Sequence, residues 1–301
     1  MSSAAHPSRH GMTTHTLAVS GATITYDVHG PLTSDTPLLL IGSPMDASGF
    51  TTLRRHFIDR PVVTYDPRNT GRSVCGEPTA AVTPWQHAAD LDALITALGS
   101  GPVDVFASSG GAVNALVCVE RRPGAIRTLV AHEPPAGGAL ADHNHISAAC
   151  THMVESYDAA GTGPAMAEFI RLVMHRGPVD DAYLAGPAPD PAQFGLPTED
   201  DGSRTDPLMS NMRGLGVDYV PDVERLTAAS TRIVIAVGEE SGGPEDGEMA
   251  GRAAYAVARL LGQDAVVFPG GHQGFLGGEY GQTGRPTEFA AALRECLDTV
   301  G

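Results

Sequence analysis

Lysine is absent from this chain of 301 residues, and all 19 of its basic residues are arginines. Chemistry that depends on a lysine amine is therefore excluded for these residues: Schiff-base catalysis, the anchoring of pyridoxal phosphate and the lysine of a phosphate-binding P-loop. Acidic residues number 35, so the formal net charge is −16. A surface of this sign repels the phosphates of nucleic acids and of anionic lipids. We therefore expect no nucleic-acid partner and no membrane partner.

Cysteine is scarce and widely spaced. Cys75, Cys118, Cys150 and Cys296 form no CxxC pair, which argues against a disulfide framework or a zinc cluster and fits a reducing cytoplasm. Long apolar runs are lacking too, since no stretch approaches the ~20 residues of a membrane span. Residues 1–15 lack the apolar segment of a signal peptide and are expected to form a flexible leader. These patterns predict a cytoplasmic protein.

Short apolar runs recur along the rest of the chain. They are typical of strands buried on both faces of a parallel sheet, and helical segments lie between most of them. The runs are residues 37–42, 62–66, 103–108, 126–131, 232–238 and 264–269. Ahead of them, residues 16–29 alternate in polarity around Ser20-Gly21, which predicts an antiparallel hairpin. The whole pattern predicts an α/β protein with a doubly wound, mostly parallel sheet flanked by helices.

The strand pattern stops between Pro135 and Thr231. Helical segments over 146–157 and 164–175 replace it, and a stretch rich in Pro, Gly and Asp follows over 186–207. A gap of this length indicates an inserted lid. We therefore expect a helical cap over 137–228, inserted into a core made of 16–136 and 229–301. Apolar residues of its helical segments are candidates for a substrate pocket: Met153, Tyr157, Met166, Phe169, Ile170, Leu172, Val173 and Met174.

The strongest local signal is FASSGGAVNA at residues 106–115, between a predicted strand and a predicted helix. A tight strand-to-helix turn requires small residues two positions before and two positions after its apex. Ala107 and Gly111 bracket Ser109 in this way, whereas an apex at Ser108 would put Phe106 in a crowded position. Ser109 is therefore the predicted nucleophile, in a variant of the G-x-S-x-G elbow.

Three further motifs appear in order along the chain: Gly42-Ser43-Pro44 after an early strand, DPRNTGRS at 66–73 and PGGHQGF at 269–275. With the elbow, they resemble the α/β-hydrolase superfamily, although Ile41 and Asn69 depart from its pattern. The resemblance implies the α/β-hydrolase fold, with a mostly parallel sheet of eight strands. It also implies a Ser-His-acid triad in which His272 is the base. The backbone N–H groups of Ser43 and Gly110 take the oxyanion-hole positions.

The acid of this triad has two candidate locations. The family's common position, G-x-x-D after the penultimate strand, reads Gly238-Glu-Glu-Ser241 here, so Glu240 or Glu239 would have to serve after a small shift. The second location is the end of the strand after the elbow, where some relatives carry the acid and this chain has Glu133. Glu133 is favoured because a partly buried carboxylate is costly without a partner. Glu240 remains the alternative.

The other histidines are expected to be bystanders, among them His87 on a predicted helix. His143, His145 and His152 lie close in sequence, but no carboxylate stands at ligand spacing beside them. We therefore expect neither a metal site nor a cofactor.

These features predict a serine hydrolase that cleaves a small, largely apolar carboxylic ester, lactone or thioester through an acyl-enzyme. Its expected partner is a small-molecule substrate, and the oligomeric state does not follow from the sequence. A cofactor-free perhydrolase would use the same triad. A non-hydrolytic member of the fold, either a ligand-binding protein or a cyclase, is the other alternative. Epoxide hydrolases and haloalkane dehalogenases are disfavoured, because they need a carboxylate where Ser109 stands.

Overall fold

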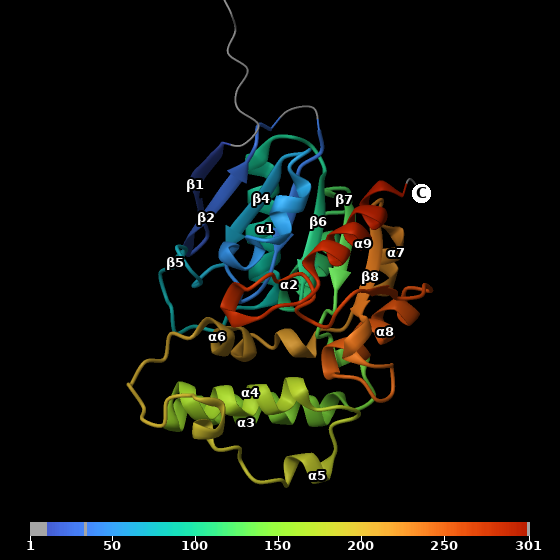
Figure 1. Ribbon diagram of the computed structural model, residues 1–301. Helices are drawn as coiled ribbons and strands as arrows, with labels where there is room; N and C mark the ends of the chain where they lie inside the picture. The colour runs from blue at the N-terminus through green and yellow to red at the C-terminus, as the bar shows by residue number, and fades with distance from the viewer. Residues whose placement is uncertain (1–10, 33–34, 300–301) are drawn as a thin grey trace, which may run out of the picture.

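The computed structural model describes residues 11–32 and 35–299. One sheet runs through the molecule in the order β1-β2-β4-β3-β6-β7-β8-β9, with the short β5 paired to β2 (Figure 1). Pairing is antiparallel from β1 to β4 and parallel from β4 to β9. The strands are β1 (Met12–Val19), β2 (Ala22–His29), β3 (Leu38–Ile41), β4 (Val62–Asp66), β5 (Val74–Cys75), β6 (Val103–Ser108), β7 (Ile126–His132), β8 (Arg232–Gly238) and β9 (Val266–Phe268). The predicted α/β class and mostly parallel sheet are confirmed.

The first strand begins earlier than expected. Met12 to His15 lie in β1 and pair with β2, although the expected leader covers residues 1–15. The reason is that β1 is an edge strand whose first five residues are exposed, so burial imposes no apolar pattern on them. The rest of the expected leader, residues 1–10, lies outside the described residues.

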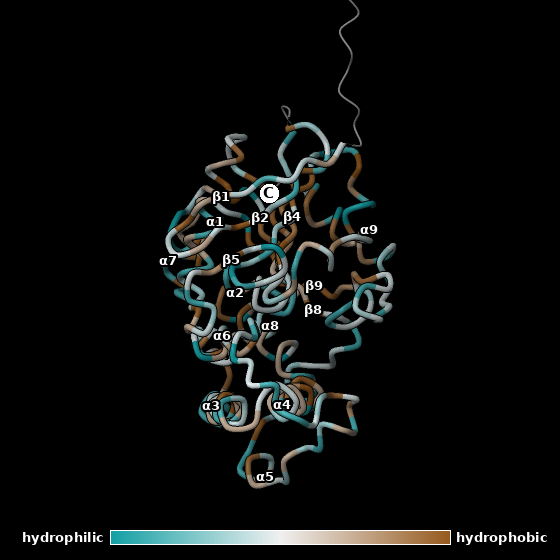
Figure 2. The backbone as a smooth tube through the Cα atoms, turned by 90° about the vertical axis from the view of Figure 1, so that its left-hand side faces the viewer, coloured by the Kyte–Doolittle hydropathy of each residue, from teal (hydrophilic) through white to brown (hydrophobic). Residues whose placement is uncertain are grey.

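Successive side chains of the central strands enter two separate cores. In β3, Leu39 and Ile41 belong to one buried cluster and Leu38 and Leu40 to the other, as the two-residue period of a strand requires. Helices α1 (Pro84–Leu98), α2 (Gly110–Arg121) and α8 (Met249–Leu260) cover the first face. Helix α9 (Pro286–Asp298) and the 3₁₀ turns η1 (Ala47–Phe50) and η2 (Leu53–Phe57) cover the second. Figure 2 shows the apolar colour gathered along the interior strands.

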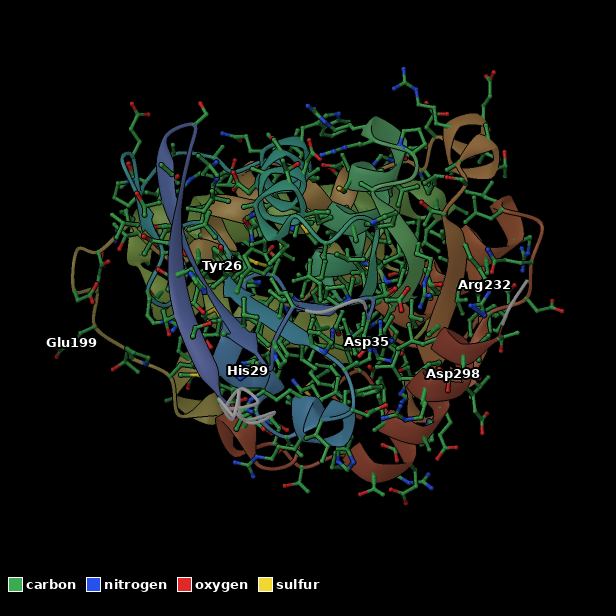
Figure 3. The ribbon with its side chains drawn as sticks, turned by 90° about the horizontal axis from the view of Figure 1, so that it is seen from above. Tyr26, His29, Asp35, Glu199, Arg232 and Asp298 are labelled. Atoms are coloured by element: carbon green, nitrogen blue, oxygen red, sulfur yellow. The ribbon has the colours of Figure 1, made fainter. Side chains whose placement is uncertain are left out.

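The chain between β7 and β8 forms helices, and all but the last of them lie at the bottom of Figure 1, beyond the carboxyl ends of the parallel strands. They are α3 (His143–Ala160), α4 (Thr162–Met174), α5 (Asp181–Leu184), α6 (Pro207–Arg213) and α7 (Val223–Ala228), with 3₁₀ turns η3 (Gly137–Ala139), η4 (Pro191–Phe194) and η5 (Gly216–Asp218). Two further 3₁₀ turns, η6 (Glu239–Ser241) and η7 (Glu279–Gly281), follow in the C-terminal part. The pair α3–α4 packs in a third buried cluster, which also includes Leu208 and Met209 of α6 and Met249 of α8. Glu199, labelled in Figure 3, lies on the outer loop between η4 and α6.

The end of the range expected for the cap belongs to the core instead. Leu226 of α7 and the nearby Tyr219 are buried in the cluster that lies under α1 and α2. Tyr219 also donates a hydrogen bond from its hydroxyl to Glu120 of α2, at 2.5 Å. The side chains over 219–228 therefore pack on the sheet, and the separate helical layer ends before them.

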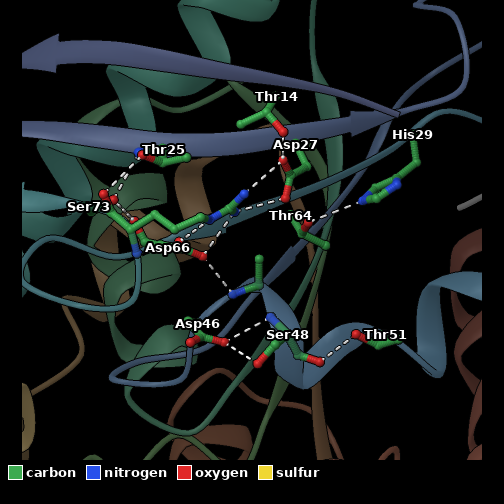
Figure 4. Close-up of polar contacts among 12 residues, drawn as sticks. Thr14, Thr25, Asp27, His29, Asp46, Ser48, Thr51, Thr64, Asp66 and Ser73 are labelled. Atoms are coloured by element: carbon green, nitrogen blue, oxygen red, sulfur yellow. Dashed lines mark hydrogen bonds and ion pairs between the residues drawn. The ribbon is translucent and has the colours of Figure 1, made fainter. Parts of the chain in front are cut away.

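The motif at 66–73 forms a network of hydrogen bonds and ion pairs with the strands beside it (Figure 4). The buried Asp66 carboxylate accepts hydrogen bonds from the N–H groups of Ala47 and Arg72, and Arg72 also bridges to Asp27 on β2. Ser73 donates to the Asp66 carbonyl and accepts from the Thr25 N–H. These bonds tie β2, β4 and η1 together beside the loop that holds Ser43.

Candidate active site

Three neighbouring strands end together at one edge of the sheet. Ser108 of β6 pairs with His132 of β7, and His132 in turn pairs with Ala236 of β8. The residues that follow the first two strands are Ser109 and Glu133. Because parallel strands carry their functional residues at their carboxyl ends, this edge brings the predicted nucleophile and one candidate acid close together.

Ser109 forms the apex between β6 and α2 with φ of 57° and ψ of −132°, a strained backbone conformation for a residue with a side chain. Its N–H donates to the carbonyl of His132 at 3.0 Å. Gly111 is required two residues later, because a Cβ there would lie 2.9 Å from the Cα of Gly42. The backbone of the Ser43 loop thus packs directly against the start of α2, and the elbow has the geometry that its small residues predict.

His272 and Glu133 are hydrogen bonded. The Nδ1–H of His272 donates to Oε2 of Glu133 at 2.5 Å, and Oε1 of Glu133 accepts from the N–H of Gly238 at 2.8 Å. The Glu133 side chain is 1% exposed. Its backbone has φ of 47°, a second left-handed residue at this edge. The carboxylate therefore fixes both the orientation and the tautomer of the imidazole, which leaves Nε2 as the nitrogen able to accept a proton.

The two groups shift each other's pKa. Burial alone would raise the pKa of Glu133, but the hydrogen bond from His272 and the nearby imidazole charges lower it to about 2. Desolvation would likewise lower the pKa of His272, and the hydrogen bond and charge of Glu133 raise it instead. Glu133 is thus held as a carboxylate, and the protonated imidazole is stabilised.

The alternative acids, Glu239 and Glu240, make no hydrogen bond to His272. Glu239 forms an ion pair with Arg285 on the surface. Glu240 is exposed and lines the same cavity as His272, and its backbone N–H donates to Gly270 at 3.1 Å. Among the described residues, the carboxylate that contacts His272 is that of Glu133. Ser241, at the family's usual acid position, is buried.

The predicted oxyanion-hole residues are neighbours. A Cβ added to Gly110 would lie 2.8 Å from the carbonyl oxygen of Ser43, so the two backbones are in contact. Gly110 is the first residue of α2, where an N–H has no partner within the helix. The Ser43–Pro44 peptide bond is cis. Ser43 and Gly110 line the cavity together with Ser109 and His272.

This cavity has a volume of about 920 Å³ and lies between the sheet edge and the helices of residues 137–228. Five of the candidate pocket residues, all on α4, line it: Met166, Phe169, Leu172, Val173 and Met174. Met153 and Tyr157 are instead buried in the cluster between α3 and α4. Among the described residues, no arginine lines the cavity, whereas Asp46, Asp206, Glu240 and Glu248 do. Its walls are mainly apolar, and the carboxylates among the described residues give them a negative charge.

Sequence reasoning missed two polar residues of the cavity wall. Asn211 of α6 donates from Nδ2 to the Ser43 hydroxyl at 3.1 Å and accepts at Oδ1 from Nε2 of His87 at 2.9 Å. His87 was expected to be a bystander, but it is buried and lines the cavity. No local motif marks either residue. The one feature that marks His87 is its position on the face of α1 that is buried, where a histidine needs a polar partner.

A third histidine lies beneath the site. His132 is fully buried, and neither ring nitrogen has a hydrogen-bond partner among the described residues. Phe106 and Phe289 surround it, and its ring centroid is 6.1 Å from that of His272. Burial lowers its pKa to about 4, so it is neutral at ordinary pH.

The histidines of α3 bind separate carboxylates. His143 contacts Asp218, His145 contacts Asp181, and His152 contacts Glu168. Within residues 11–32 and 35–299 no group of three or more metal-binding side chains comes together. The same part of the chain contains no helix with the length and apolar character to cross a membrane.

Comparison with known proteins supports the fold. No family model matches the chain. An uncharacterised hydrolase, YraK of Bacillus subtilis (strain 168), is 34% identical over 120 residues, a match that spans 40% of this chain and 44% of that protein. A thermophilic esterase from Thermogutta terrifontis superposes with a TM-score of 0.65 at 19% identity, covering 95% of this chain and 98% of the esterase. An α/β-hydrolase from Sphaerobacter thermophilus DSM 20745 gives 0.64 at 20% identity, covering 94% and 100%.

The sheet order, the elbow and these superpositions define the class: the chain has the α/β-hydrolase fold. The resemblance to the α/β-hydrolase superfamily that the four motifs indicate is confirmed at the level of this fold.

Proposed function

We propose that the protein is a serine hydrolase with Ser109 as nucleophile, His272 as base and Glu133 as the acid of the triad. The observation that carries the proposal is that one cavity is lined by a strained serine elbow and by a histidine that is hydrogen bonded to a buried glutamate. A serine hydroxyl is a poor nucleophile until an oriented imidazole takes its proton. The partial match to an uncharacterised hydrolase and the fold of an esterase support the same class.

In the proposed reaction, the Ser109 hydroxyl oxygen attacks the carbonyl carbon of an ester, lactone or thioester while its proton passes to Nε2 of His272. Glu133 stabilises the resulting imidazolium, and the N–H groups of Ser43 and Gly110 bind the oxyanion. Collapse of the tetrahedral intermediate breaks the bond to the leaving group, which takes the proton from His272. Water then attacks the acyl-enzyme and gives a proton to the same imidazole. The bond between the acyl carbon and the Ser109 oxygen breaks, Ser109 takes that proton from His272, and the carboxylic acid leaves.

The cavity favours an uncharged acyl group. Its walls carry Met166, Phe169 and Leu172, and methionine side chains adapt to irregular apolar shapes. An acyl group that bears its own carboxylate or phosphate would enter without an arginine to pair with and would meet Glu240 and Glu248. We therefore assign a neutral, mid-sized apolar ester, lactone or thioester as substrate class.

Perhydrolase activity and non-hydrolytic binding or cyclisation are the remaining alternatives. A perhydrolase would need the same Ser109 and His272 and would differ by turnover that depends on peroxide. A binding protein or cyclase would bind an apolar compound without forming an acyl-serine.

Intact mass after treatment with a fluorophosphonate tests the proposal. The wild-type protein is expected to gain the mass of one phosphonyl group, and Ser109→Ala is expected to gain none. Ser108→Ala, one residue away, serves as the matched control and should still react. A folded wild-type protein that forms no adduct, or an adduct retained in Ser109→Ala, would refute the assignment and favour the binding protein.

A further inference from the structure

Three polar side chains that do not belong to the proposed triad form a hydrogen-bonded network at the loop after β3, which carries Ser43. His87 on α1 contacts Asn211 on α6, and Asn211 contacts the hydroxyl of Ser43 on the loop after β3. All three line the cavity that contains Ser109. They approach Ser43, whereas Glu133 is hydrogen bonded to His272. The proposed mechanism uses only the backbone of Ser43 and leaves this side-chain network without a role.

The chemistry of His87 sets the direction of the hydrogen bonds. Burial lowers the pKa of His87, so its ring is neutral and carries one N–H. Nδ1 is buried without a partner among the described residues. An unpaired buried N–H is rarer in proteins than an unpaired acceptor, which favours the tautomer with its proton on Nε2. That N–H donates to Oδ1 of Asn211, and the amide of Asn211 must then turn its Nδ2 donor toward Ser43.

The Ser43 hydroxyl is left with a proton to donate. Its oxygen accepts from Asn211 at 3.1 Å, and no acceptor for the hydroxyl proton is found among the described residues. The side chain is buried at the cavity wall, and its backbone contacts Gly110 beside Ser109. A hydroxyl that accepts from one amide is polarised toward donating its own proton.

We propose that the Ser43 hydroxyl is a third donor to the oxyanion, in addition to the backbone N–H groups of Ser43 and Gly110, and that Asn211 and His87 are positioning residues that aim it. This inference rests on the proposed function, because it concerns the same tetrahedral intermediate. The two hydrogen bonds of the network and the proposed bond to the oxyanion run in one direction, from His87 through Asn211 and Ser43 to the developing negative charge. Donors held in this way need no reorganisation when the charge forms.

The position of α6 supports a fixed network. The N–H of Val82 donates to the carbonyl of Ser210 at 2.9 Å, and a Cβ on Gly214 would lie 1.9 Å from the carbonyl oxygen of Val82. The helix that carries Asn211 is therefore packed backbone to backbone against the segment that leads into α1 and His87. The distance between these two side chains is set by rigid elements.

The test measures the rate of phosphonylation of Ser109 by a fluorophosphonate, since this reaction also places an oxygen in the oxyanion hole and needs no knowledge of the natural substrate. Ser43→Ala keeps both backbone donors and is expected to react about 10²-fold more slowly, the effect of losing one donor. Asn211→Ala is expected to slow the reaction about tenfold. Ser210→Ala is the matched control, because it removes a hydroxyl from the same helix without contacting Ser43.

The Asn211→Asp variant tests whether Asn211 orients the Ser43 hydroxyl or has only a structural role. The aspartate is nearly isosteric, so a structural role predicts that it retains more activity than Asn211→Ala. Its carboxylate accepts the Ser43 proton and turns it away from the oxyanion, so our inference predicts a loss at least as large as that of Asn211→Ala. Circular dichroism and thermal unfolding verify that each variant is folded.

Three outcomes decide between the possibilities. Slower reaction of Ser43→Ala, with Asn211→Asp no better than Asn211→Ala, supports the inference. Wild-type rates in folded Ser43→Ala overturn it and leave the proposed function intact. A wild-type protein that does not react overturns the proposed function and this inference with it.

Discussion

Replacement of Glu133 by glutamine removes the negative charge of the side chain and keeps its size and shape. Glutamine keeps an oxygen that accepts from the Gly238 N–H, but it presents an amide N–H₂ to Nδ1 of His272 where the carboxylate accepts a proton. The imidazole then favours the tautomer with its proton on Nε2, which is unable to deprotonate Ser109. It also loses the charge that stabilises the imidazolium. Both effects act on the acylation step.

The magnitude follows from the pKa of Glu133. The environment of Glu133 lowers this pKa from 4.5 to about 2, which corresponds to about 3 kcal/mol in favour of the charged form. Losing this interaction in the transition state lowers kcat/KM by about two orders of magnitude, and the wrong tautomer adds to the loss. We therefore expect a decrease of roughly 10²–10⁴-fold.

The assay is ester hydrolysis by Glu133→Gln and, as the matched control, Glu240→Gln. Glu240 lines the same cavity and carries the same charge, but the structure places no hydrogen bond between it and His272. Its variant is expected to change kcat/KM by less than tenfold. Equal losses in the two variants, or a larger loss in Glu240→Gln, would refute the assignment of Glu133.

Three further predictions follow from the buried charges. Because the pKa of His272 is raised and only the neutral imidazole accepts a proton, kcat/KM should increase with pH with a midpoint above 6.5, and a flat profile would contradict its role as base. His132 has a pKa of about 4 against 6.5 when unfolded, so the unfolded state binds the additional proton as the pH falls below 6.5. Stability therefore decreases toward acid pH, and urea unfolding of His132→Leu between pH 6.5 and 4.5 should show a slope smaller by about 1 kcal/mol per pH unit. An unchanged slope would argue against a neutral buried ring. Asp90→Ala leaves the Arg68 guanidinium buried without its bidentate partner and should cost about 3–5 kcal/mol of unfolding free energy. Asp92→Ala, whose ion pair is exposed, should cost at most about 1 kcal/mol, and similar costs in the two variants would contradict this reasoning.

The sheet was predictable because burial on both faces leaves a strong pattern. Leu38 to Ile41 must all be apolar, since alternate side chains enter two different cores. The start of β1 was not predictable for the opposite reason. Thr13, Thr14 and His15 lie on an exposed edge strand, where polar residues pair as well as apolar ones.

The candidate triad was accessible from sequence because its members stand at strand ends. The positions of Ser109 and Glu133 follow from the order of the strands, and His272 follows β9. Their catalytic roles remain predictions. Asn211 left no sequence signal, because its partners, Ser43 and His87, lie 168 and 124 residues away along the chain. Such contacts depend on how the helices between β7 and β8 pack, which local patterns do not determine.

The helical layer over the cavity is attached in two different ways. Helix α6 is held to the core through Val82 and carries Asn211, whereas α4 supplies the apolar wall and packs mainly with α3 in the third buried cluster (Figure 1). Helix α6 also contacts α3, because its residues lie in the same buried cluster and the Asp206 N–H donates to the Tyr157 hydroxyl at 3.0 Å. Under the proposed function, substitutions on the cavity side of α4 would therefore reshape the acyl pocket, whereas exchange of the whole α3–α4 hairpin would also disturb the helix that carries Asn211. Among these helices, the cavity side of α4 is thus the part that can vary with the least effect on the position of Asn211.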